Sequence, residues 1–85
     1  MYDSERVWNI ALAVSKVVRL FAPLAKSNVY VTRIDREQRD VLRINRINQL
    51  DADVVKAIKE TIEANFCESL EYRKTLKTYM DFYLD

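Results

Sequence analysis

Five of the eight arginines in this chain lie within fourteen residues, and no lysine separates them. They are Arg33, Arg36, Arg39, Arg43 and Arg46. A guanidinium group presents a planar fork of N–H donors, which matches a carboxylate or a phosphate with two hydrogen bonds. Three acidic residues, Asp35, Glu37 and Asp40, reduce the net charge of the segment to +2. The cluster therefore has three candidate roles: local ion pairs on a solvated surface, contact with an acidic protein surface, and binding of nucleic acid.

The spacing of these arginines fits two conformations. Arg36, Arg39, Arg43 and Arg46 are three, four and three residues apart. On a helix over 36–48 they would fall within an arc of about 80°, as on a recognition helix that reads DNA. The apolar residues scatter around such a helix, whereas a strand over 41–47 places Leu42 and Ile44 together on one face. We favour the strand, which divides the arginines between two faces.

The end of the chain is rich in aromatic residues. Four of the nine aromatics lie in the last fourteen residues, at Tyr72, Tyr79, Phe82 and Tyr83. Tyrosine is favoured where one end of the ring is buried and the other is wet, as at protein interfaces. A terminal helix packed on the core, with its hydroxyls outward, explains the pattern equally well. We predict that Tyr72, Tyr79 and Tyr83 join the five arginines in a partner-binding surface.

The residues that are missing exclude several kinds of chemistry. The chain has no glycine and no histidine, so it contains no glycine-rich phosphate loop and no histidine-based triad or zinc site. The single Cys67 cannot form an intramolecular disulfide or a four-cysteine zinc site, and we interpret it as a small core residue. We expect no enzymatic activity, no cofactor and no metal.

Composition indicates one small domain over residues 1–85. The chain is 49% hydrophobic and 32% charged, with a net charge of +1. This balance allows a core but provides no strong field that would steer nucleic acid. Lys16 and Arg19 interrupt the apolar N-terminal run, which is therefore neither a signal peptide nor a membrane span. A lone cysteine fits a reducing compartment, so we expect a cytoplasmic protein that does not contact membranes.

The first segment, over 3–26, is predicted to form a helix. Its apolar residues recur at helical spacing and are Val7, Ile10, Ala11, Val14, Val17, Val18, Phe21 and Ala25. Asp3 or Ser4 can cap it, and Pro23 should end it near Phe21 or Ala22. Because Trp8, Leu12, Ala13 and Leu20 widen the apolar face, we expect this helix to be buried on two sides.

A β-hairpin and a second helix are predicted next. β-branched and aromatic residues over 29–34 indicate a strand, which pairs with 41–47 through a loop at 35–40. A helix follows over 51–66, with Asp51 as its N-cap and Leu50 and Val55 at the two positions of a hydrophobic staple.

The segment 69–85 fits two periodicities. Tyr72, Leu76, Tyr79, Met80 and Tyr83 follow a helical stripe, and Leu70, Tyr72, Leu76, Met80, Phe82 and Leu84 alternate as in a strand. Because Lys74 and Thr78 break the alternation, we predict a helix. A strand here would add a third strand to the sheet.

Together these elements predict an α+β fold with an N-terminal helix, a β-hairpin, one long helix and a C-terminal helix; an all-α fold is the alternative. A two-stranded hairpin is marginal alone, so we expect a homodimer in which two hairpins pair across a two-fold axis. The function we expect is that of a small non-enzymatic interaction module. It would be regulatory or inhibitory, of the phage or bacterial adaptor type, and would bind a protein partner. The alternative is a dimeric nucleic-acid-binding regulator that uses Arg36, Arg39, Arg43 and Arg46.

Overall fold

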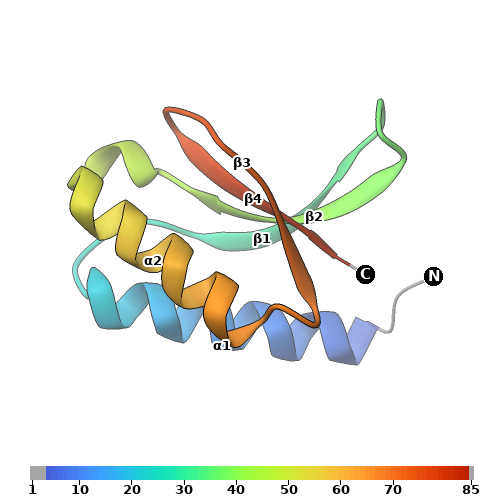
Figure 1. Cartoon of the computed structure of the whole chain (residues 1–85), viewed down its shortest axis with the longest axis horizontal. Helices are drawn as coiled ribbons and strands as arrows, with labels where there is room; N and C mark the ends of the chain where they lie inside the picture. Colours follow the sequence, from blue (N-terminus) through green and yellow to red (C-terminus); the bar gives the residue numbers. More distant parts are fainter. Residues whose placement is uncertain (1–3, 85) are drawn as a thin grey trace.

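Two helices cover one face of a four-stranded antiparallel sheet in the computed structural model, which describes residues 4–84 (Figure 1). The elements in chain order are α1 (Ser4–Phe21), β1 (Val29–Ile34), β2 (Arg39–Asn45), the short 3₁₀ helix η1 (Ile47–Gln49), α2 (Ala52–Asn65), β3 (Leu70–Thr75) and β4 (Tyr79–Leu84). The strand order β1-β2-β4-β3 joins two hairpins through the pairing of β2 with β4. The predicted α+β class is confirmed, and the all-α alternative is wrong.

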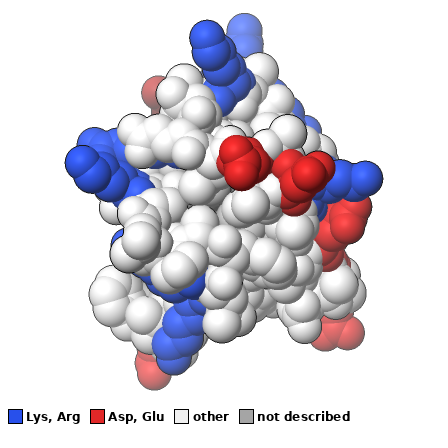
Figure 2. All heavy atoms as spheres, turned by 90° about the vertical axis from the view of Figure 1, so that its left-hand side faces the viewer, with Lys and Arg blue, Asp and Glu red and all other residues white. Residues whose placement is uncertain are grey.

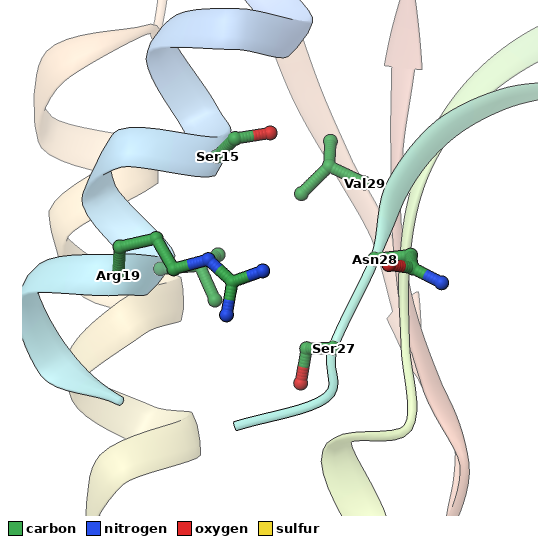
Figure 3. Close-up of a pocket in the computed structure, with 6 residues that line it drawn as sticks. Ser15, Arg19, Ser27, Asn28 and Val29 are labelled. Atoms are coloured by element: carbon green, nitrogen blue, oxygen red, sulfur yellow. The ribbon is translucent and has the colours of Figure 1, made fainter. Parts of the chain in front are cut away.

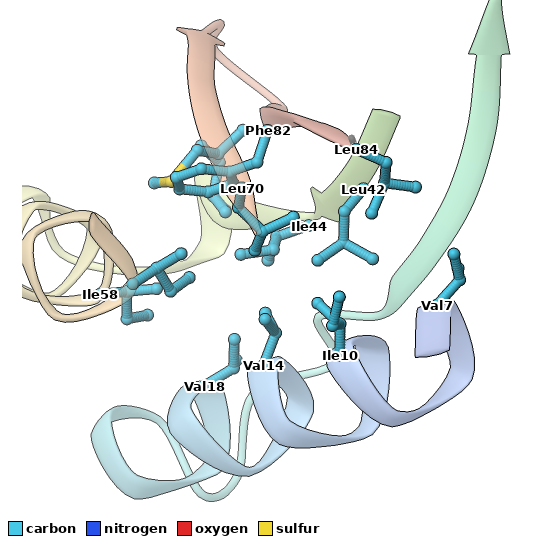
Figure 4. Packing of buried hydrophobic residues seen from close by; sticks show 13 residues of the cluster. Val7, Ile10, Val14, Val18, Leu42, Ile44, Ile58, Leu70, Phe82 and Leu84 are labelled. Carbon is cyan, nitrogen blue, oxygen red and sulfur yellow. The ribbon is translucent and has the colours of Figure 1, made fainter. Parts of the chain in front are cut away.

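The core lies between the helices and the sheet. The buried residues of α1 are Val7, Ile10, Val14 and Val18, which point toward the sheet (Figure 4). Opposite them, β2 and β4 contribute every second side chain, because successive residues of a strand point to opposite faces. These residues are Leu42, Ile44, Met80, Phe82 and Leu84, and α2 adds Ile58 and Ile62.

Helix α1 begins at Ser4 and ends at Phe21, two residues before Pro23, as predicted. The proposed cap Asp3 lies outside the described residues. The helix packs against both α2 and β1, but the expected burial of its widened apolar face is wrong for three residues. Trp8, Leu12 and Leu20 are 67%, 46% and 80% exposed, because the core takes only one stripe of the helix.

The first hairpin is confirmed, with a shorter loop than predicted. Its loop covers 35–38, so β2 begins two residues before the predicted 41. In a chain without glycine, Gln38 adopts the left-handed backbone conformation of this turn, with φ of 56°. Its side chain stabilises the turn by donating to the Asp35 carbonyl oxygen at 2.8 Å. Arg46 has the same φ, 56°, where β2 gives way to η1.

Helix α2 is close to the predicted 51–66. Asp51 is its N-cap, although the Asp51 side chain makes no capping hydrogen bond; its carbonyl oxygen accepts from the Val55 N–H at 3.0 Å. Leu50 and Val55 both pack against the core. The Phe66 N–H closes the last turn on the Ile62 carbonyl oxygen.

The predicted C-terminal helix is wrong, and a second hairpin stands in its place. Strand β4 pairs with β2 on one side and β3 on the other, so Met80, Phe82 and Leu84 reach the core with strand periodicity. The two residues that broke the alternation have local explanations. Lys74 follows an irregularity between Tyr72 and Lys74 in the β3–β4 pairing, and Thr78 lies in the turn.

The second hairpin gives one chain the four-stranded sheet that the sequence suggested two chains would build together. Edge strands remain at β1 and β3. Among residues 4–84, no helix is long and apolar enough to cross a membrane.

Candidate functional site

Residues from the predicted arginine and tyrosine surface meet on the sheet face opposite the helices, which we call the open face. Within residues 4–84 both helices lie on the other face (Figure 1). The register pairs Arg43 of β2 with Asp81 of β4, and Asn45 with Tyr79. These side chains share the open face because Leu42, Ile44, Met80 and Phe82 point to the core.

Asp81 is the centre of an ion-pair network on the open face. Its side chain has no exposed surface. Arg43 donates to it twice, from Nε at 2.8 Å and from Nη2 at 2.9 Å, and Arg73 donates from Nη1 at 3.0 Å. The hydrogen bonds between Arg43 and Asp81 raise the pKa of the Arg43 guanidinium above its ordinary value. A buried carboxylate is stable only when it is paired and hydrogen-bonded, and two arginines meet that condition here.

Glu37 extends the network from the β1–β2 loop. Its carboxylate accepts a hydrogen bond from Arg73 Nε at 3.0 Å and another from the Tyr83 hydroxyl. The hydrogen bond from Arg73 and, to a smaller extent, that from Tyr83 lower the pKa of Glu37 from 4.5 to about 2. The same contact with Glu37 raises the pKa of Tyr83. The network therefore ties the β1–β2 loop to both strands of the second hairpin.

Two arginines also stack on tyrosine rings of the open face. The Arg39 guanidinium lies 3.8 Å from the centroid of Tyr83, and that of Arg43 lies 3.9 Å from the centroid of Tyr79. Both distances are within the range of cation–π attraction. The structure thus brings Arg39, Arg43, Tyr79 and Tyr83 together.

Tyr72 does not join this group. Its ring packs edge-on against Phe82, with centroids 5.6 Å apart, and Lys59 of α2 lies 4.4 Å from its centroid. Phe82 belongs to the core, so Tyr72 lies on the helix side of the sheet.

The other predicted arginines are dispersed. Arg33 pairs with Asp40 at 3.4 Å and donates to Gln38 at 3.1 Å. Arg36 and Arg46 are exposed, and no ion pair with another described residue involves them. The structure therefore places five arginines in three environments rather than on one basic face.

The sequence reasoning missed the central members of the network, Arg73 and Asp81. Arg73 and Glu37 are 36 residues apart, and Arg43 and Asp81 are 38 apart. No local pattern connects residues at such separations. The one available signal was an arginine and an aspartate within the strand-like alternation of the tail, where a charged side chain needs a partner.

The network has the properties of a structural cluster. Its two carboxylates, Glu37 and Asp81, each accept hydrogen bonds from a guanidinium group. Among the described residues, no group of three or more His, Cys, Asp or Glu residues could hold a metal ion. Cys67 was predicted to be a core residue, and this is wrong: it is exposed in the turn between α2 and β3.

A second candidate surface follows α1 and the chain that leaves it. Seven large hydrophobic residues are exposed within residues 4–84, and six of them lie in α1, in the connection that follows it or in β1. They are Trp8, Leu12, Leu20, Phe21, Leu24 and Tyr30. Tyr30 is opposite Arg43 in the sheet, so its side chain lies on the open face and the other five form the surface along α1 and the turn after it. The end of the molecule where α1 turns back toward β1 faces the viewer in Figure 2, where uncharged atoms cover the area below two acidic groups near the centre and most Lys and Arg side chains lie at the margin.

A shallow groove runs between α1 and the edge strand β1. Its walls come from Val7, Trp8 and Ala11 on the helix and from Val29, Tyr30 and Val31 on the strand, with a volume of about 390 Å³. The outer edge of β1 has no neighbouring strand in the sheet. An apolar groove beside an open strand edge is a common site for a protein segment.

A smaller pocket between α1 and the start of β1 has a polar lining (Figure 3). Two of its polar side chains donate hydrogen bonds to the backbone of the chain itself. Ser15 Oγ donates to the Ala11 carbonyl oxygen at 2.9 Å, and Arg19 Nη1 donates to the Ala25 carbonyl oxygen at 2.6 Å. Ser27 Oγ is buried without a hydrogen-bond partner. The Arg19 hydrogen bond ties the end of α1 to the connection that leads to β1.

No family model, curated protein or solved structure matches this chain.

Proposed function

We propose that this protein is a small non-enzymatic interaction module, regulatory or inhibitory, that binds a protein partner through the exposed side of α1. The observation that carries the proposal is that α1 leaves Trp8, Leu12 and Leu20 67%, 46% and 80% exposed on the sides of the helix that do not meet the core. Small soluble domains rarely leave such residues together in water unless another surface covers them. The exposed Cys67 fits a reducing compartment, and we propose a cytoplasmic location.

The open face supports this proposal indirectly. Arg39, Arg43, Tyr79 and Tyr83 are held by contacts within the chain, so a partner binding there would compete with existing ion pairs. Segment 36–48 contains the strand β2 rather than a helix with aligned arginines, which removes the geometry of a recognition helix. Arg36 and Arg46, the members of the predicted cluster that form no ion pair with a described residue, flank β2 at its two ends.

Photo-crosslinking tests the proposal. Leu12 is replaced by p-benzoylphenylalanine in cells that express the chain, and crosslinked proteins are identified by mass spectrometry. A captured protein is then purified and titrated against the unmodified chain, with the emission of Trp8, the one tryptophan, as the signal. We expect saturable binding at a fixed stoichiometry, with a blue shift as Trp8 leaves water.

Two variants make the titration specific. Leu12→Glu places a charge on the proposed surface, and Leu76→Glu is its matched control. The two leucines are 46% and 45% exposed, and Leu76 lies at the β3–β4 turn, away from α1. Binding should be lost in the first variant and retained in the second. An equal loss of partner binding in Leu12→Glu and Leu76→Glu would contradict the proposal. Binding of nucleic acid at physiological salt would also contradict it, if the double variant Arg36→Ala/Arg46→Ala abolished that binding.

A further inference from the structure

The exposed side of α1 carries a palindromic row of side chains, which we call the α1 stripe. It consists of Glu5, Trp8, Leu12, Lys16 and Arg19, and all five residues are exposed. Their spacings are three, four, four and three residues, which confine them to an arc of about 80° on a helix. This arc lies on the side of α1 opposite to the buried Val7, Ile10, Val14 and Val18.

The chemistry of the α1 stripe is complementary to itself in the antiparallel direction. A two-fold axis through Leu12 places Glu5 opposite Arg19 of the second copy, because both lie seven residues from Leu12. It also places Trp8 opposite Lys16 of the second copy, four residues away. The first pair joins opposite charges and the second joins a cation to the aromatic face that attracts cations most strongly. Each pair occurs twice, and Leu12 meets its own copy on the axis.

Arg19 can make its contact in the α1 stripe without losing the one it has. Arg19 uses Nη1 for the Ala25 carbonyl oxygen, and its guanidinium has four further N–H donors. Antiparallel helices also align their dipoles favourably, since each N-terminus then lies beside the other C-terminus. A parallel arrangement would instead oppose Glu5 to Glu5 and Arg19 to Arg19.

We infer that the occupant of the exposed side of α1 is a second copy of this chain, packed antiparallel through the α1 stripe. The inference rests on the proposed function, because it names the partner for the same surface. It differs from the dimer expected from the sequence, in which hairpins pair. One helix-on-helix contact buries less area than a standard interface. We therefore expect a reversible dimer and examine it over protein concentrations from about 1 µM to about 1 mM.

Sedimentation equilibrium of the full chain over this concentration range is the primary test. The weight-average mass should rise from 10.1 kDa toward twice that value, and the emission of Trp8 should shift to the blue over the same range. Leu12→Glu, which brings two carboxylates together on the axis, should hold the mass at that of one chain. Leu76→Glu should dimerise as the wild type does.

A charge exchange tests the antiparallel register. Arg19→Glu and Glu5→Arg should each abolish dimerisation, because each makes both copies of the end pair repulsive. The double variant Glu5→Arg/Arg19→Glu should recover it. Far-UV circular dichroism checks that every variant is folded. A loss in either single variant without recovery in the double variant would refute the register.

A wild-type mass of one chain at 1 mM, with unchanged Trp8 emission, would overturn the inference. The proposed function would survive that result if the Leu12 crosslink captures a different protein whose purified form binds in a Leu12-dependent manner. Both would fail if Leu12→Glu affected neither self-association nor any protein partner, or if the α1 stripe bound only vesicles of anionic phospholipid.

Discussion

Removing the charge of Asp81 should destabilise this protein more than removing that of any exposed carboxylate. Asp81 has no exposed surface, and its guanidinium partners Arg43 and Arg73 are only 20% and 7% exposed. The substitution Asp81→Asn leaves these two cations without their shared counter-charge, and the amide NH₂ faces N–H donors that it cannot accept from. Breaking a buried ion pair from one side costs about 3 to 5 kcal/mol.

That cost is a large part of the total stability. A domain of this length has an unfolding free energy of about 4 to 13 kcal/mol. The Asp81→Asn variant should therefore unfold at a much lower urea concentration than the wild type. If the cost of about 5 kcal/mol meets a wild-type stability of about 4 kcal/mol, the variant would be largely unfolded without denaturant. Urea titration followed by far-UV circular dichroism measures the difference, since the slope of the transition should stay unchanged.

Asp35→Asn is the control for this measurement. Asp35 is 93% exposed and lies 3.8 Å from Arg33 Nε, so its ion pair is screened by water and contributes little. A loss of stability in Asp81→Asn no larger than that in Asp35→Asn would refute the view that the buried network holds the open face together.

Three further outcomes follow from the structure. The pKa of Glu37 is lowered in the fold from 4.5 to about 2, so the ionised carboxylate stabilises the fold above about pH 4.5 and this contribution is lost as the pH falls toward 2. Urea titration at each pH should therefore show the stability of Glu37→Gln approaching that of the wild type between pH 4.5 and 2. A difference in stability that stays constant with pH would contradict this assignment. Arg46 is exposed and adopts the left-handed backbone conformation, with φ of 56°, which costs a residue with a Cβ about 1 kcal/mol or more. Arg46→Gly should therefore raise the urea midpoint of unfolding. A lowered midpoint would show that the Arg46 side chain stabilises the fold. Cys67 is exposed, so a thiol reagent should modify it fully in native protein without denaturant; reaction only on unfolding would show that it is buried.

Local patterns were sufficient for the fold from α1 to the end of α2, about three quarters of the chain. The stripe from Val7 to Val18 and the position of Pro23 predict α1 and its end. The β-branched run over 29–34 and the alternation of Leu42 and Ile44 predict the first hairpin, and the amphipathic run after Asp51 predicts α2. Each signal comes from neighbours in the chain, whose spacing directly reports the face that meets the core.

The tail shows where local patterns stop. Its helical and strand periodicities were nearly equal, and the choice depended on a partner strand 38 residues away, since Arg43 and Asp81 are opposite each other in the sheet. When the tail pairs with the free edge of β2, its backbone groups form hydrogen bonds in the sheet, and Met80, Phe82 and Leu84 are buried in the core. Tertiary pairing overrides a weak local preference of this kind.

The candidate sites divide in the same way. The sequence alone excludes glycine-loop and histidine chemistry, because those residue types are absent from it. It could identify Arg39, Arg43, Tyr79 and Tyr83 as unusual, but not that Asp81, Arg73 and Glu37 engage them, because the ion pairs join side chains that meet only through the sheet. Nor could it show that Trp8 and Leu12 stay in water. An apolar side chain counts as core or surface only after the neighbouring elements are placed, and here α2 and the sheet cover only the opposite side of α1.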